Sequence, residues 1–270
     1  MPIKLKNPVS KLQQWKSSGL FLVWLIVLYP VLNLKAEIIR VAVASNFLKT
    51  AQSLSREFEA QSEHSIQLSS GSSGKLYLQI SKGAPFDLFL SADTQKPEEL
   101  VKGGFAIADS KQTYAIGKLS LWLKICQNTT DFSFLTNDLI RKIAIANPKL
   151  APYGMASKQL LEKYQLWNNL NHKMLFPENI AQVAQLAKIG IIDAAFVATS
   201  QSGALIGEEQ SCLLDIPPIY PIIAQQLVLI TNSKKHPLAK EFVQFILSRQ
   251  GQNLIKNMGY SVPNSAKIGL

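Results

Sequence analysis

Histidine and cysteine, which supply many metal ligands and catalytic nucleophiles, are scarce in this chain of 270 residues. The sequence has three histidines and two cysteines, and the two cysteines lie far apart, so no metal-ligand spacing is present. It also has no G-x-S-x-G elbow, no Walker A loop and no H-E-x-x-H motif. The sequence therefore predicts no catalytic residue, no direct metal ligand and no cofactor.

Charge is also limited. Charged residues make up 17% of the chain, and the formal net charge of +10 is spread without a dense Lys/Arg tract. Because nucleic-acid binding needs a concentrated basic surface, no nucleic-acid partner is expected. In contrast, 47% of the residues are hydrophobic, which is enough for a sizeable core in one large domain or two small ones.

The first 36 residues differ from the rest of the chain. They contain five lysines and no acidic residue. Four of the lysines precede an apolar run over residues 20–34, and Lys35 and Ala36 follow it. This order is typical of a secretory signal that is cut after Ala36, which predicts an exported, periplasmic protein. An uncleaved membrane anchor is the alternative, but Pro30 and Asn33 break a run that would need roughly 20 apolar residues.

The two cysteines, Cys126 and Cys212, leave two interpretations open. In an oxidising compartment they can form a disulfide. Each also lies among apolar residues, where free buried cysteine is common.

Strands and helices alternate along the first part of the mature chain. β-branched and apolar stretches predict strands over residues 38–44, 65–71 and 86–92, and helical spacing predicts helices over 47–61, 75–81 and up to 101. Ser45 or Asn46 is the expected N-cap of the first helix, and Asp93 or Thr94 that of the third. Such alternation predicts a parallel sheet with helices on both faces.

A second α/β set follows after a long extended segment over residues 114–126. It comprises predicted strands over 142–148 and 193–198 and helices over 155–164 and 180–188. Another extended segment, 224–230, then precedes a strongly helical end that has Pro237 at a helix start. A chain that crosses out and back in this way predicts two lobes joined by a two-strand hinge.

Hydroxyl groups cluster where the first two predicted strands end. Ser45 and Asn46 follow the first strand, and Ser72 and Ser73 follow the second. Ligands of open α/β sheets bind beyond the carboxyl ends of strands, where helix N-termini offer unpaired N–H groups and a positive dipole. The pattern indicates an anion site without a counter-charge. Serines that merely cap helices would give the same pattern, so the two interpretations stay open.

Four stretches occur in a specific order along the chain: RVAVASNFLKTAQSLSREFE, SSGSSGKLYLQISKGAPFDLFLSAD, NPKLAPYGMASKQLLEKY and FVATSQSG. Together they resemble the periplasmic molybdate-binding proteins of molybdate transporters, and the similarity covers nearly all of residues 38–262. The resemblance implies an α/β, two-lobed type II periplasmic binding protein fold with two doubly wound sheets. Lobe I would comprise residues 37–117 and 226–270, lobe II residues 118–225, and the oxyanion would lie in the cleft between them.

The resemblance also implies the residues that hold the anion. The hydroxyl groups of Ser45 and Ser73 and backbone donors at Tyr153 and Ile180 occupy the matching positions. It further implies a monomer without a cofactor, whose partners are a small oxyanion, molybdate or tungstate, and the membrane permease of an ABC transporter.

One position departs from the family pattern. Some members place a tyrosine hydroxyl on the anion just after the late strand, where this chain has Ala198. Tyr153, Thr199 or a water molecule would then replace that donor, or the site has one donor fewer. Ser72 and Asn46 are further candidates for contact with the anion.

Three other functions stay open. A receptor for sulfate or another oxyanion would use the same scaffold. An enzyme on a two-lobed α/β fold lacks a positioned acid, base, nucleophile or metal set. An interaction domain that has lost its ligand is kept open by Ala198.

Overall fold

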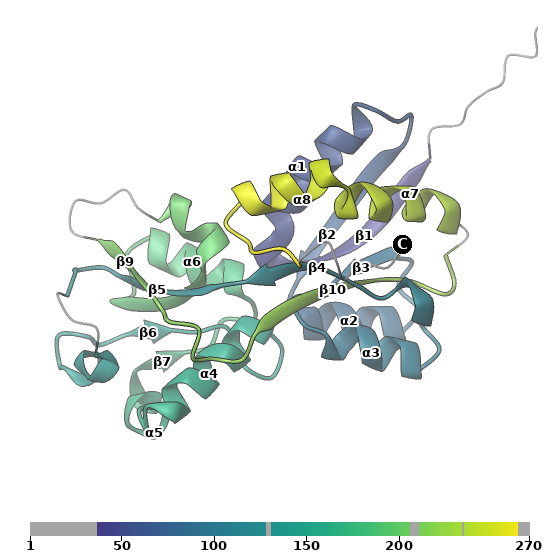
Figure 1. The fold of residues 1–270 in the computed structure, drawn as a ribbon. Helices are drawn as coiled ribbons and strands as arrows, with labels where there is room; N and C mark the ends of the chain where they lie inside the picture. Colours follow the sequence, from purple (N-terminus) through teal and green to yellow (C-terminus); the bar gives the residue numbers. More distant parts are fainter. Residues whose placement is uncertain (1–36, 128–130, 206–210, 234, 264–270) are drawn as a thin grey trace, which may run out of the picture. The chain divides into compact units, whose positions relative to one another are not determined.

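A computed structural model describes residues 37–127, 131–205, 211–233 and 235–263 (Figure 1). The predicted secretory signal and its cut after Ala36 lie outside these residues. All the described residues belong to one compact unit. Within them, no helix has the length and apolar character needed to cross a membrane.

Sheet I has the strand order β2-β1-β3-β10-β4. The strands are β1 (Ile38–Ala44), β2 (Ser65–Gly71), β3 (Leu88–Leu90), β4 (Gln112–Gly117) and β10 (Ile223–Leu229). β1 pairs in parallel with β2 and β3, whereas β10 pairs antiparallel with β3 and β4. The sheet is therefore mixed rather than wholly parallel as predicted, because the returning strand β10 inserts between β3 and β4.

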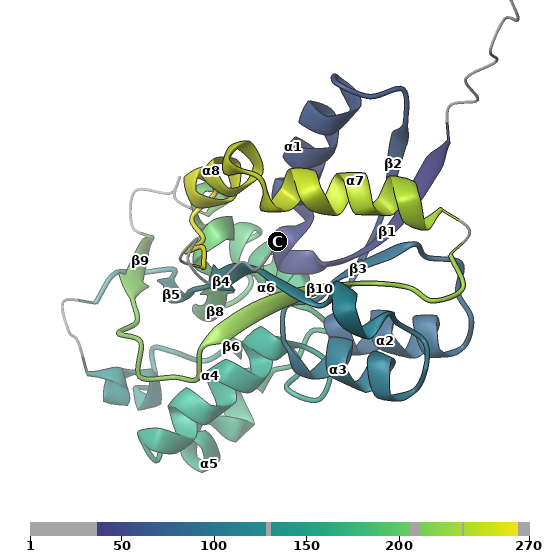
Figure 2. The same ribbon diagram turned by 45° about the vertical axis from the view of Figure 1, so that its right-hand side comes forward.

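Helices cover both faces of sheet I (Figures 1 and 2). On one face lie α1 (Leu48–Glu59), α7 (His236–Leu247) and α8 (Arg249–Asn257), and on the other lie α2 (Ser73–Ser81) and α3 (Gln95–Lys102). Alternate residues of β1 serve the two faces: Val41 and Val43 pack with α1, whereas Ala42 packs towards α2. We call sheet I with these five helices the sheet I lobe.

Sheet II has the strand order β7-β6-β8-β5-β9. Its strands are β5 (Leu119–Leu123), β6 (Ile143–Ala144), β7 (Met174–Leu175), β8 (Ala194–Ala198) and β9 (Cys212–Asp215). β6 pairs in parallel with β7 and β8, and β5 pairs antiparallel with β8 and β9. With α4 (Pro152–Lys163), α5 (Trp167–Leu170) and α6 (Ile180–Lys188) it forms what we call the sheet II lobe.

The chain crosses between the sheets twice. The segment predicted as one extended stretch over 114–126 divides into β4 and β5, and a single residue, Lys118, separates the two strands. The return, over residues 216–222, joins β9 to β10. The two crossings contact each other, because the Leu119 N–H donates to the Tyr220 hydroxyl at 2.9 Å.

The predicted cap of the first helix is wrong. A short 3-10 turn, η1 (Ser45–Phe47), precedes α1, and no side chain caps either element. At α3 the N-cap residue is Thr94, whose side chain makes no capping bond, and the carboxylate of the preceding Asp93 instead accepts from the Lys96 N–H at 2.8 Å. Burial raises the pKa of Asp93 above its ordinary value, although the hydrogen bonds from Lys96 N–H and the Ser91 hydroxyl act in the opposite direction.

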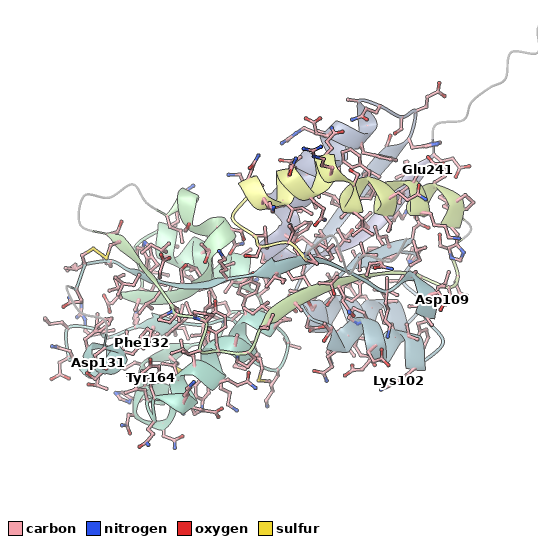
Figure 3. The ribbon with its side chains drawn as sticks, in the orientation of Figure 1. Lys102, Asp109, Asp131, Phe132, Tyr164 and Glu241 are labelled. Carbon is pink, nitrogen blue, oxygen red and sulfur yellow. A yellow bond between two sulfur atoms is a disulfide. The ribbon has the colours of Figure 1, made fainter. Side chains whose placement is uncertain are left out.

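The two cysteines are paired. The disulfide Cys126–Cys212 joins the loop just after β5 to the first residue of β9, with the two Cα atoms 5.4 Å apart (Figure 3, yellow bond). In the same lobe, Phe132 and Tyr164 make an edge-to-face contact with ring centroids 5.0 Å apart. Of the two interpretations left open by the sequence, the structure supports the disulfide.

Candidate anion-binding site

A small cavity lies where the carboxyl ends of β1 and β2 meet the first turns of α4 and α6. Its lining residues come from both lobes: Ala44, Ser45, Asn46, Gly71, Ser72, Ser73, Ala92, Ala151, Pro152, Tyr153 and Ile180. The volume is about 10 Å³, which is room for about one water-sized sphere. Six of the seven predicted site residues are thus brought together, and the lobes meet closely around them.

Two larger hollows contain none of the predicted residues. One, of about 310 Å³, adjoins the small cavity and shares Ala92, Ala151 and Pro152 with it. The other, of about 660 Å³, is an apolar groove beside α7. The convergence of hydrogen-bond donors, rather than size, identifies the small cavity as the candidate site.

Serine hydroxyls form the contribution of the sheet I lobe. The Ser73 hydroxyl oxygen accepts from the Ala92 N–H at 3.0 Å, so its own proton is available for a further acceptor. Ser72 accepts from the Lys75 N–H at 3.4 Å as the N-cap of α2. The Ser45 hydroxyl, which is also buried, makes no hydrogen bond to any described residue. All three residues can therefore donate into the cavity.

The Asn46 side chain is already engaged within the protein. Its amide donates to Gln225 Oε1 at 2.9 Å and to the Tyr260 hydroxyl at 3.1 Å, and the Tyr260 hydroxyl donates back to the Asn46 carbonyl at 2.8 Å. Gln225 Oε1 also accepts from the Tyr114 hydroxyl at 3.2 Å. Asn46 is therefore held by β10 and by the segment after α8, both far along the chain, and this network fixes the turn that carries Ser45.

Backbone N–H groups form the contribution of the sheet II lobe. α4 begins at Pro152 with no side-chain cap, so the Tyr153 N–H has no intrahelical partner. α6 begins at Ile180, and its N-cap Asn179 accepts from the N–H groups of Ala181 and Gln182, both at 3.1 Å. The Ile180 N–H is left outside that cap. Two helix N-termini thus direct unpaired donors at one cavity, with the positive ends of their dipoles behind them.

The Tyr153 side chain turns away to the crossing between the sheets. Its hydroxyl accepts from Gln225 Nε2 at 3.4 Å, and a Cβ atom placed on Gly117 would lie only 2.1 Å from that hydroxyl. Burial raises the pKa of Tyr153 well above its ordinary value, so the phenol stays neutral. No other lining residue is ionisable, and the cavity therefore carries no charged side chain.

Ala198 does not line the cavity. It ends β8 in the fully buried core of sheet II, and the next hydroxyl, that of Thr199, is paired with the Ser120 hydroxyl at 2.7 Å. Neither the Tyr153 nor the Thr199 hydroxyl is thus directed at the cavity in this structure.

Besides the bond from Gln225 to Tyr153 at the crossing, four direct bonds between described residues join the lobes around the cavity. Two lie at α2: the Gly74 N–H donates to the Leu150 carbonyl at 2.9 Å, and Lys75 Nζ pairs with Glu178 at 2.9 Å. Two lie at η5 (Thr199–Ala204), where the Ser200 hydroxyl donates to the Tyr260 hydroxyl at 2.9 Å and Gln201 donates to the Ser45 carbonyl at 3.4 Å.

Sequence reasoning missed most of the residues that support the site, namely Gly74, Tyr114, Gln201, Gln225 and Tyr260. Their partners lie up to 214 residues away in the sequence, as for Asn46 and Tyr260. No local motif marks them. Gly74 itself lay in a predicted turn, just before the helix predicted over residues 75–81, where a glycine is ordinary.

A family model and the most similar relatives agree on one family for this chain. The family described as "Bacterial extracellular solute-binding protein" matches residues 39–261. The chain is 34% identical to the molybdate-binding protein ModA of Rhodobacter capsulatus, over 81% of this chain and 86% of that one. It is 36% identical to ModA of Azotobacter vinelandii, over 83% of this chain and 90% of that one.

Solved structures agree with these relatives. The periplasmic molybdate-binding protein of Azotobacter vinelandii superimposes with a TM-score of 0.78 at 35% identity, covering 84% of this chain and all of that one. The sulfate-binding protein SubI of Mycobacterium tuberculosis H37Rv shares the fold, with a TM-score of 0.73 at 19% identity over 86% of this chain and 88% of that one.

Proposed function

The chain belongs to the bacterial extracellular solute-binding proteins, in the group of molybdate-binding proteins, and we propose that it captures molybdate or tungstate for an ABC uptake transporter. The anion would occupy the cavity between the sheet I and sheet II lobes. The protein would be a receptor rather than an enzyme, with no cofactor, acting as a monomer that hands its ligand to a membrane permease. We also propose a periplasmic location, which is supported by the relatives and by an N-terminal signal that we propose is cut after Ala36.

The observation that supports this proposal is a cavity lined by hydroxyl and backbone N–H donors and by no charged side chain. Hydroxyl groups of Ser45 and Ser73 face backbone N–H groups of Tyr153 and Ile180, and no charged side chain lines the cavity. Hydrogen bonds to a charged group contribute about 1.5–3 kcal/mol each, so four such donors suffice to hold a dianion. A protonated anion such as hydrogen phosphate would need a serine hydroxyl to accept its proton instead of donating to the anion, at a cost of about 1–3 kcal/mol.

Binding requires the lobes to separate and close again. Both lobes wall the cavity of about 10 Å³, and the bond from the Gly74 N–H to the Leu150 carbonyl ties them together, so a tetrahedral oxyanion can enter only when the lobes move apart. We propose lobe I at residues 37–117 and 226–270 and lobe II at residues 118–225, which move about the two crossings. Only the closed form brings all four donors to one anion, so the anion binds this form better and shifts the population towards it.

Sulfate is the second candidate ligand. It is also a tetrahedral dianion without protons at neutral pH, and it is smaller than molybdate. The small volume of the cavity is the observation that favours it.

A binding panel tests the proposal. Titration calorimetry and thermal shift with molybdate, tungstate, sulfate and phosphate should rank molybdate and tungstate first and phosphate last. Ser81→Ala, at the far end of α2, is the matched control for serine substitutions at the cavity, because the Ser81 hydroxyl bonds only the Leu78 carbonyl. Tightest binding of sulfate would select the second candidate, and no binding of any of the four anions would refute both.

A further inference from the structure

The two lobes touch through backbone at Gly74. This residue is the second of α2 in the sheet I lobe, and its N–H donates to the carbonyl of Leu150, which precedes α4 in the sheet II lobe. A Cβ atom on residue 74 would lie 2.9 Å from the Leu150 oxygen and 3.1 Å from its Cα. Side-chain carbons do not approach backbone so closely, so any residue other than glycine would force the two lobes apart.

Neither the Gly74 backbone nor the Leu150 backbone can move away from the contact without displacing the groups bonded around it. The turn before α4 is fixed by the Asn147 carbonyl, which accepts from the N–H groups of Leu150 at 3.0 Å and Ala151 at 2.9 Å. On the other side, Gly74 adjoins Ser73, whose hydroxyl is held by the Ala92 N–H. A displacement at the contact would therefore move whole helix starts rather than one side chain.

The contact lies between two of the proposed anion donors. Ser73 is the neighbour of Gly74 in the chain, and Tyr153 is three residues after Leu150. The separation of these helix starts sets the distance between the Ser73 hydroxyl and the Tyr153 N–H. If residue 74 carried a side chain, both donors would remain intact but would not reach the same anion.

We propose that Gly74 is a positioning residue that sets how far the lobes close on the anion. This inference rests on the proposed function and adds a residue that contributes no donor to the ligand. The backbone of Gly74 is not in the left-handed region, which among the described glycines is occupied by Gly83, Gly104, Gly190 and Gly259. Alanine thus fits the conformation of α2, and its clash exists only when the lobes are closed.

Gly74→Ala separates this role from a structural one. In the variant, we expect at least a 10-fold loss of molybdate affinity by calorimetry and a reduced ligand-induced compaction in small-angle scattering. The melting temperature without anion should be unchanged or higher, because alanine restricts the unfolded chain and suits a helix. Gly203→Ala is the matched control, since a Cβ there meets no atom within 4 Å and its φ is also ordinary; it should behave as the wild type.

Three outcomes would overturn the inference: affinity within twofold of the wild type, full compaction at saturating anion, or a fall of several degrees in the melting temperature without anion. The last would mean that α2 itself needs glycine. The wild-type titration reports separately on the proposed function. If the wild type binds sulfate instead of molybdate, the same comparison is made with sulfate, and if it binds no anion the proposed function fails before the variant is considered.

Discussion

The two lobes contribute to the cavity in chemically different ways. The sheet I lobe presents side-chain hydroxyls at the ends of β1 and β2, whereas the sheet II lobe presents backbone N–H groups at the starts of α4 and α6. A hydroxyl can be removed by one substitution that leaves the backbone in place. A backbone donor can be disturbed only by moving the helix that carries it. One half of the site is therefore readable from residue types, and the other half only from the fold.

The largest loss of stability and of anion binding is expected from a substitution that displaces a helix carrying one of the backbone N–H donors. A Cβ atom on Gly154, in the first turn of α4, would lie 2.0 Å from the Ala146 carbonyl oxygen. Gly154→Ala should lower the free energy of unfolding by about 1–3 kcal/mol or more. The added methyl group would clash with backbone atoms, which cannot move aside as a flexible side chain can. Chemical denaturation measures this, and calorimetry should show anion binding lost as well. Wild-type stability in this variant would mean that α4 can shift freely.

Removal of the side-chain half should weaken binding without unfolding the protein. Ser45→Ala and Ser73→Ala should each reduce anion affinity by about 1–3 kcal/mol, roughly 5- to 150-fold, because each removes one donor to a charged ligand. Titration calorimetry measures the affinity, with Ser81→Ala as the control. If both variants bind as the wild type does, these serines have no role in the ligand site.

The N-cap of α6 is a side chain that supports a backbone donor without being one, so its removal should have an effect on stability between those of the two previous predictions. Asn179 holds the N–H groups of Ala181 and Gln182 but not that of Ile180. Asn179→Ala should cost about 0.5–2 kcal/mol of stability, as is usual for an N-cap. Affinity should fall less than in Ser73→Ala, because the Ile180 N–H remains while its helix start loosens. A loss of affinity larger than in the serine variants would show that the cap side chain itself contacts the anion.

The smallest effect concerns pH. Burial raises the pKa of Tyr260 to about 12, and burial also raises the pKa values of Tyr114 and Tyr153 well above the ordinary value. A phenol whose pKa is raised on folding stabilises the protein fully below the ordinary value of about 10, and this contribution is lost as pH rises towards 12.

Molybdate affinity should therefore be flat between about pH 6 and 9, and thermal stability should fall only above about pH 10. Tyr260→Phe should flatten part of that alkaline fall, while lowering stability at neutral pH by the loss of its hydrogen bonds. A change in molybdate affinity with a midpoint near neutral pH would show that a titrating group contributes to the site, contrary to this prediction.

The sequence predicted the parallel half of sheet I well. β1 and β2 have the predicted bounds, as does α6 in the sheet II lobe, because apolar periodicity and the turn residues around them are local signals. β10 was predicted as a strand, but its antiparallel place between β3 and β4 depends on partners more than 100 residues away. Asn46 illustrates the same limit: its residue type and position favour a helix N-cap, yet its side-chain amide bonds to Gln225 and Tyr260 instead.

The candidate site follows the same division. Ser45, Ser72 and Ser73 were found from their positions after strands, and all three line the cavity. Tyr153 and Ile180 were placed by family resemblance, because an unpaired N–H leaves no mark on residue type. Gly74 was visible only once Leu150 was found against it.

The single residue between β4 and β5 limits the kinds of motion that the two lobes can make. A link of one residue, tied through Leu119 to Tyr220 of the return segment, permits rotation about itself but little sliding. The axis of opening should therefore pass near Lys118, and displacement should grow with distance from it, as along a lever arm. Groups beside the axis, such as the Tyr153 hydroxyl against Gly117, can stay in contact throughout the swing. A spectroscopic distance label beside Lys118 would thus report almost no change on binding, whereas a pair of labels across the far rim, on α2 and α6, would report nearly all of it.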